Sequence, residues 1–131
     1  MITHVNPAAL HTNPAFSQAT IAPAGRTLYI GGQDGTDATG AIPSTDAGEQ
    51  TKQAMRNVLA ILAEVGATQA DVVKLNIYID PSVDITAGFA ASAEVWGANP
   101  TAITVLQISP ARPDALVEID AIAVLPDRRV E

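Results

Sequence analysis

Two carboxylates interrupt an apolar run near the end of the chain. Glu118 and Asp120 lie two residues apart within residues 117–124. Successive side chains of a β-strand point to opposite faces, so both carboxylates are expected on one face. Burying a lone charge is costly, so each carboxylate must either meet water or be paired. Two interpretations stay open: a solvent-exposed strand face, or a general acid/base that lines a cleft at a subunit boundary.

Three glycines follow a strand-like run earlier in the chain. Gly31, Gly32 and Gly35 come directly after residues 26–30. They do not match a dinucleotide-binding loop, because a polar loop follows them where that motif requires a helix. They either form a tight turn or let a ligand approach bare backbone N–H groups, as a carboxylate or an oxyanion would require.

The histidines indicate neither a metal site nor a catalytic triad. His4 and His11 lie seven residues apart near the N-terminus, without a glutamate close to either. We therefore predict no metal site and interpret both as surface residues. No histidine falls in a core position from which it could serve a Ser-His-Asp triad. The chain has no cysteine, which excludes disulfides and thiolate nucleophiles.

Composition predicts a single domain spanning residues 1–131, with 47% apolar residues and a net charge of −7. The seven cationic residues are scattered, so we do not expect nucleic acid as a main partner. No apolar run approaches the roughly 18 residues that span a bilayer, so no membrane partner is expected. Residues 1–7 lack the pattern of a signal peptide, and we expect a cytoplasmic protein.

The predicted elements alternate between strands and helices. Strands are expected over residues 16–21, 26–30, 73–80, 101–108 and 115–124, and helices over residues 46–65 and 82–97. A hairpin through residues 23–25 is the simplest connection between the first two strands. Asp46 and Glu49 fit a capping box, and Gly66 stands where a left-handed residue ends a helix.

The order ββαβαββ predicts an α+β domain with the helices on one face of a mixed sheet. The other face also carries apolar residues, so a partner subunit is expected to cover it. In the second helix, Ile85, Phe89, Ser92 and Trp96 are expected to share one side.

Five segments, in this order, resemble the Rid/YjgF family. The first two are Phe16-Ser17-Gln18-Ala19 and Ile30-Gly31-Gly32-Gln33. The third is the long helix signature, which comprises Gln50, residues 57–62 and Gly66-Ala67. The last two are Asp71-Val72-Val73-Lys74 and residues 118–123. The resemblance implies a chorismate-mutase-like fold and a homotrimer. In that family three sheets form an inner barrel, and small-molecule ligands bind in clefts between subunits.

The resemblance also implies a chemistry. The best-known members hydrolyse enamines and imines, such as 2-aminoacrylate, without a cofactor, and we expect none here. Glu118 matches the glutamate that positions the attacking water, so it is the expected catalytic residue. The residues expected to contact the ligand are Phe16, Ser17, Gly31, Gly32, Ala102, Ile103 and Thr104.

One departure from the family concerns substrate recognition. The family's deaminases hold the substrate carboxylate with a bidentate arginine, and the matching position here is Ala102. Arg112 follows Pro110-Ala111 in a later turn, six residues before Glu118, and is not expected to replace it. Phe16 stands where the family has a tyrosine, which makes the expected cleft more apolar.

Two functions from different classes remain. The chain is either a Rid-like hydrolase (deaminase-like) of an imine, enamine or related electrophile, inefficient on 2-imino acids, or a non-catalytic small-metabolite binding protein. The retained Glu118 favours the hydrolase. A ribonuclease function, which is also associated with this family by name, is disfavoured because the acidic chain repels nucleic acid.

Overall fold

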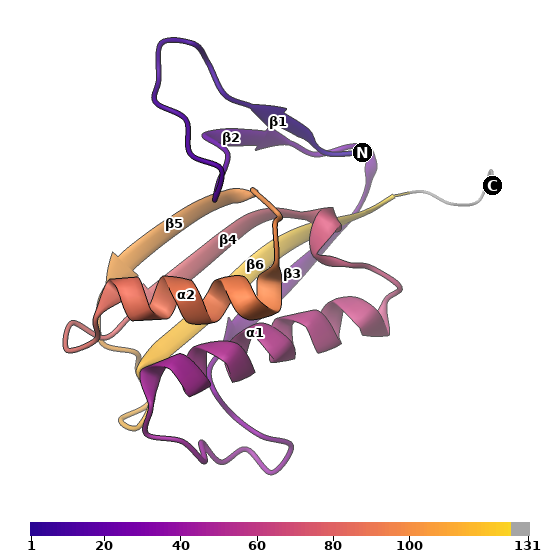
Figure 1. Cartoon of the computed structure of the whole chain (residues 1–131). Coiled ribbons are helices and arrows are strands. Elements are labelled where there is room, and N and C mark those ends of the chain that lie inside the picture. Colours follow the sequence, from indigo (N-terminus) through magenta and orange to yellow (C-terminus); the bar gives the residue numbers. More distant parts are fainter. Residues whose placement is uncertain (127–131) are drawn as a thin grey trace.

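The computed structural model describes residues 1–126 and contains a four-stranded mixed sheet with two helices on one face (Figure 1). The elements are β1 (Thr3–Val5), β2 (Ala19–Ile21), β3 (Gly25–Gln33), α1 (Ala47–Glu64), the 3-10 helix η1 (Gln69–Asp71), β4 (Val72–Ile79), α2 (Ile85–Trp96), β5 (Ala102–Gln107) and β6 (Val117–Pro126). This arrangement confirms the predicted α+β class. The short strand β1 was not predicted.

The strand order of the main sheet is β3-β6-β4-β5. β6 is antiparallel to both of its neighbours, and β4 is parallel to β5, with α2 as the crossover between them. The predicted hairpin through residues 23–25 is wrong, because β2 pairs with β1 in a separate two-stranded sheet. β3 pairs instead with β6, which offers it a much longer ladder than the three residues of β2.

Local capping rules account for the bounds of α1. Asp46 is the N-cap and accepts a hydrogen bond from the Glu49 backbone N–H at 2.9 Å. The reciprocal half of the predicted capping box is not formed, since the Glu49 carboxylate lies 3.6 Å from Lys52 Nζ instead. Gly66 has a φ of +73°, the left-handed conformation expected of it.

The buried side of the helix α2 combines two small residues with one large one. Gly88, Ala91 and Trp96 are the buried residues, whereas Phe89 is 45% exposed, so the predicted apolar side is only partly correct. A Cβ atom built on Gly88 would lie 3.8 Å from Ile79 Cδ1. α2 packs mainly against α1, and side chains such as that of Ile79 fill the space between α2 and the sheet.

The core lies between the helices and one face of the sheet. Met55, Leu62, Leu75 and Ile119 are among its fully buried side chains. The opposite face, here called the open face, carries Tyr29, Lys74, Asn76, Tyr78, Ala102, Thr104, Leu106, Glu118, Asp120 and Ile122, as strand alternation and register require. No helix of the described residues covers it (Figure 1). Within residues 1–126, none of the helices has the length and apolarity needed to cross a membrane.

Candidate functional site

The carboxylate of Glu118 lies against a bulge in β3. The β3–β6 register shifts between Ile30, opposite Ala121, and Gln33, opposite Ile119, so Gly31 and Gly32 form the irregular segment. Bulges of this kind recur beside active sites, where they redirect a strand.

The two bulge glycines differ in their surroundings. A Cβ atom on Gly32 would lie 2.2 Å from Glu118 Oε2, whereas a Cβ on Gly31 would meet nothing within 4 Å. The bare Cα of Gly32 therefore makes room for the Glu118 carboxylate. Neither glycine has a positive φ, so space and not backbone conformation is what requires Gly32.

Asp120 shares the open face with Glu118, as the spacing predicted, but it is held by neighbouring side chains. Asn76 stands opposite it on β4 and donates a hydrogen bond to Asp120 Oδ1 at 2.7 Å. Hydrogen bonding to Asp120, together with desolvation and the charges of Asp120 and Glu118, raises the pKa of the Tyr78 phenol above 10.0. Asp120 is thus a paired carboxylate, and Tyr78 is its protonated neighbour at neutral pH.

Glu118 has no such partners. No hydrogen bond joins its carboxylate to another side chain or backbone group of residues 1–126. It lines an open pocket of about 240 Å³ with Tyr78, Ile108, Ser109, Pro110, Ala111 and Asp120. A carboxylate that lacks internal donors and faces a pocket can accept a proton from a bound water or ligand.

Of the other predicted ligand contacts, Ala102 lies at the opposite end of the open face, and Thr104 lies between the two ends, level with Asn76. Ala102 pairs with Lys74 across the β4–β5 ladder, and Thr104 Oγ1 accepts a hydrogen bond from Lys74 Nζ at 2.6 Å. Ile103 does not join this group, because its side chain packs against the helix-covered core.

Ser17 is used within the fold. It is 3% exposed and forms a bridge with Ala102. Its hydroxyl donates to the Pro100 carbonyl and accepts from His4 Nδ1 at 2.8 Å. His4, interpreted from the sequence as a surface residue without a role, therefore ties β1 to the start of β5. Phe16 packs edge-on against His11, with ring centroids 6.2 Å apart.

The two ends of the open face are too far apart for one small ligand in a single chain. Ala102 is level with Lys74 on β4, whereas Glu118 is level with Tyr78, four residues further along. At about 3.3 Å per residue, this places the two ends roughly 13 Å apart along the strands. A small ligand that contacts both ends must therefore lie between two copies of the chain.

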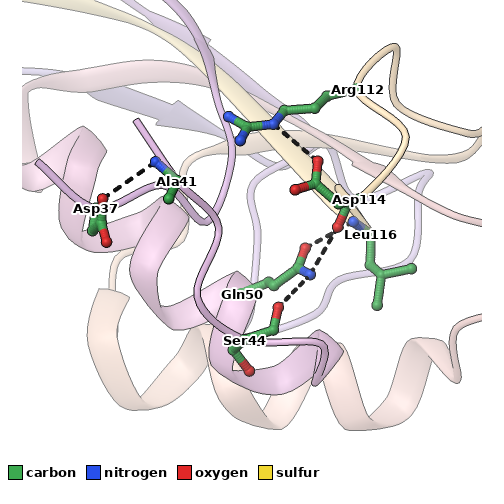
Figure 2. Close-up of polar contacts among 7 residues, drawn as sticks. All are labelled: Asp37, Ala41, Ser44, Gln50, Arg112, Asp114 and Leu116. Carbon is green, nitrogen blue, oxygen red and sulfur yellow. Dashed lines mark hydrogen bonds and ion pairs between the residues drawn. The ribbon is translucent and has the colours of Figure 1, made fainter. Parts of the chain in front are cut away.

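Arg112 does not reach the Glu118 pocket. Figure 2 shows its side chain directed at Asp114, and Arg112 Nε lies 2.9 Å from Asp114 Oδ1. That Arg112 does not replace the arginine absent at Ala102 stays a prediction.

The structure also identifies residues that were not singled out as site residues from the sequence. Three of them, Lys74, Asn76 and Tyr78, lie on the polar side of β4. From the sequence, their alternation with apolar residues predicted only that this side of the strand is not part of the core. Gln50 is 1% exposed on α1 and anchors the loop before β6, part of which lines the pocket. The one sequence signal for Gln50 was its place in the helix segment that resembles the family.

The fold and the site define a class of small α+β proteins with a helix-covered sheet, an open charged face and a carboxylate pocket at one end of that face. The family model described as Endoribonuclease L-PSP matches residues 6–125. The chain belongs to this family, the Rid/YjgF family, which confirms the resemblance seen in the sequence.

Relatives and solved structures agree with this assignment. A RutC family protein from Pyrococcus horikoshii is 36% identical over 109 residues, 82% of this chain and 85% of the relative. A goat protein named 2-iminobutanoate/2-iminopropanoate deaminase is 32% identical over 110 residues, 83% of this chain and 79% of the relative. The crystal structure of a Rid family protein of unknown function from Yersinia pestis has a TM-score of 0.84 at 32% identity, covering 95% of this chain and 98% of that one.

Proposed function

We propose that this protein is a cofactor-free hydrolase of a small imine or enamine. The observation that carries the proposal is Glu118, a carboxylate that lacks internal hydrogen-bond donors and lines a pocket. Relatives named as imine deaminases support the same reaction type. Glu118 takes a proton from water as the water oxygen bonds to the imine carbon. The carbinolamine then loses ammonia, after the proton passes to nitrogen, and a carbonyl product forms.

The proposed assembly is a homotrimer with ligand clefts between subunits. Its physical support is the separation of the two ends of the open face, which one chain cannot bring to one small ligand. Tyr29 and Leu106 on this face are 75% and 50% exposed, and burying such surface against another copy is favourable. In such an assembly, Glu118 of one copy would work beside Ala102 and Thr104 of the next.

The expected substrate preference follows from Ala102. An alanine cannot form the bidentate pair by which an arginine holds a carboxylate. Loss of a charge-assisted contact of this kind costs several kcal/mol of substrate binding. We therefore expect slow hydrolysis of 2-imino acids relative to arginine-containing deaminases.

One turnover assay tests the hydrolase. 2-Iminopropionate is generated in situ, and release of ammonia and pyruvate is followed with the native protein, Glu118→Gln and Ala102→Arg. We expect slow native turnover, a loss of about 100-fold or more in Glu118→Gln, and a gain in kcat/KM of at least about tenfold in Ala102→Arg.

The outcomes separate the alternatives. A native rate equal to that of arginine-containing deaminases would show that Ala102 does not limit this substrate. Turnover that is unchanged in Glu118→Gln would refute the proposed role of Glu118. If none of the three proteins acts, the non-catalytic binding protein becomes the better description.

A further inference from the structure

We propose that Lys74, positioned by Thr104, binds an oxyanion group of the ligand, either a carboxylate or a phosphate. The inference rests on the proposed function in one respect, because it places Lys74 in the same intersubunit site as Glu118. It adds the residue that recognises the ligand and the charge that the ligand must carry.

The direction of the Lys74 side chain is the first observation. Lys74 stands on β4, between β6 and β5. Its ammonium group reaches toward β5 and donates to Thr104 Oγ1 at 2.6 Å. Asp120 lies on β6, on the other side, and is paired with Asn76 instead. Lys74 thus turns away from the nearest paired carboxylate of its own face.

The second observation is that the charge of Lys74 is not neutralised by the described part of the chain. No carboxylate oxygen of residues 1–126 lies within 4 Å of its ammonium nitrogen. Lys52 shows the contrast, because its Nζ contacts both Glu49, at 3.6 Å, and Glu94, at 2.9 Å. In a chain with 14 acidic and 7 basic residues, an unneutralised lysine on a strand face is a candidate for an external anion.

The third observation is the position of Lys74 on the open face. Among residues 1–126, Lys74 is the one lysine or arginine whose strand position lies on this face. Arg26 of β3 lies on the same side as Leu28 and Ile30, which is the core side. Ala102, directly opposite on β5, adds only a methyl group beside the ammonium. The exposed Thr104 holds the ammonium in place without a competing charge.

The chemistry of the ammonium group defines the ligand class. Lysine has three N–H donors, and Thr104 takes one of them, so two remain for an external acceptor. A compact ammonium binds carboxylate or phosphate as a point charge, without the planar fork of arginine. In the proposed trimer, Lys74 of one copy would hold the anion while Glu118 of the next handles water. The ligand is therefore a small imine or enamine that carries an oxyanion.

Equilibrium binding to the full-length protein tests this directly, without any need for turnover. Pyruvate and inorganic phosphate are titrated, with methyl pyruvate as the neutral probe, and Kd is measured by calorimetry or ligand-observed NMR. We expect Lys74→Met to weaken binding of the preferred anion by at least about tenfold, as loss of a charge-assisted hydrogen bond should. Lys74→Arg should retain most of the affinity, and Thr104→Val should weaken it less than Lys74→Met.

Two matched variants serve as controls. Lys52→Met makes the same change in net charge on α1, where the lysine is ion-paired, and should leave the Kd unchanged. Arg112→Met removes the cation closest to Glu118 along the sequence and should also leave the Kd unchanged. Melting temperature and mass are compared for every variant, so that unfolding or dissociation is recognised.

Several results would overturn the inference. The inference fails if the native protein binds neither anion, or if Lys74→Met binds the anion as tightly as the native protein does. It also fails if Arg112→Met loses binding, or if methyl pyruvate binds as tightly as pyruvate. A preference for pyruvate identifies the oxyanion as a carboxylate, and a preference for phosphate identifies it as a phosphate. Glu118→Gln should bind the anion at least as tightly as the native protein, because it removes a like charge from the same site, while it loses turnover. Failure of the hydrolase and failure of this inference are therefore distinguishable.

Discussion

Glu118 and Asp120 occupy the same face of one strand, yet their surroundings give them different roles. Asp120 is bonded to Asn76 and interacts with Tyr78, both from β4. Glu118 lies over the bare Cα of Gly32 and faces a pocket. The spacing of the two carboxylates predicted their shared face. Their division into a paired and an unpaired carboxylate depends on which strands lie on either side of β6.

Gly32→Ala is expected to displace the Glu118 carboxylate. The added Cβ would lie 2.2 Å from Oε2, and the flexible end of the side chain can move aside at little cost in stability. We therefore expect a small change in melting temperature but a fall in turnover of about tenfold or more, as for a misplaced catalytic group. Gly88→Ala, on α2 and outside the Glu118 pocket, is the control and should leave turnover nearly unchanged, since its Cβ would lie 3.8 Å from Ile79 Cδ1, an ordinary contact. Equal losses in both variants would contradict the positioning role of Gly32.

The titration of Tyr78 reports on Asp120. Because its folded-state pKa is raised above 10.0, the folded protein keeps the phenol proton when the unfolded chain begins to lose it. This contribution to stability is fully present below about pH 10 and is lost as pH rises through the raised pKa. In a Tyr29→Phe background, Tyr78 is the sole tyrosine, and absorbance at 295 nm follows its ionisation.

We expect a midpoint above 10.0 in that background. Asp120→Asn should lower the midpoint, because it removes the negative charge and replaces the carboxylate acceptor by a weaker, neutral amide oxygen. A midpoint that does not move in Asp120→Asn would show that the two side chains do not interact.

At the scale of elements, α1 joins two loops through one buried side chain. Gln50 Nε2 donates to the carbonyls of Ser44, at 2.9 Å, and Asp114, at 3.1 Å, while Gln50 Oε1 accepts from the Leu116 backbone N–H at 2.8 Å (Figure 2). The loop before β6 contributes Ala111 to the pocket. Gln50 thus connects the first turns of α1 to the pocket wall.

Gln50→Ala is expected to destabilise the protein by about 3 kcal/mol, because it removes three hydrogen bonds and leaves their partners unsatisfied in a buried site. Gln53→Ala is the matched control. Gln53 donates one bond to Asn57 within the same helix, and its loss should cost under about 1 kcal/mol. Urea denaturation measures both values, and similar costs for the two variants would contradict the anchoring role of Gln50.

The ends of the two helices were predictable to different degrees. α1 begins after Asp46 and ends at Glu64, shortly before the left-handed Gly66, as its sequence indicated. α2 begins after Asp84 and not at Ser82, because the Ser82 hydroxyl and backbone N–H both donate to Asp80. Such a local side-chain turn competes with the first turn of a helix, and two nearby candidate caps cannot be ranked from the sequence alone.

In the whole molecule, the open face is the side of the main sheet that no helix of residues 1–126 covers, and we expect other copies of the chain to bind there. We expect native protein to have a mass of about 40 kDa by light scattering, three times the 13.5 kDa chain. Leu106→Glu places a charge on the open face, within the proposed interface, and should shift the mass toward that of a monomer. Phe89→Glu, on α2 and similarly exposed, should leave the assembly intact. A native monomer, or a Leu106→Glu trimer, would contradict the proposed assembly.

Features set by neighbouring residues were determined by the sequence itself. These include the alternation of β4, the N-cap at Asp46, the left-handed Gly66 and the shared face of Glu118 and Asp120. Each depends on interactions within a few residues along the chain. The assignment of Glu118 and the ligand contacts to a catalytic site stays a prediction, as do the cytoplasmic location and the trimer.

Only the tertiary structure determined which side chains and strands, far apart in the sequence, pair with one another. The Lys74–Thr104 and Asn76–Asp120 bonds join residues 30 and 44 positions apart, and β3 pairs with β6 instead of the nearby β2. Strand order is selected by the burial of the whole sheet against the helices, which no short segment encodes. For the same reason, only the fold shows that the Glu118 and Lys74 ends of the open face are separated within one chain.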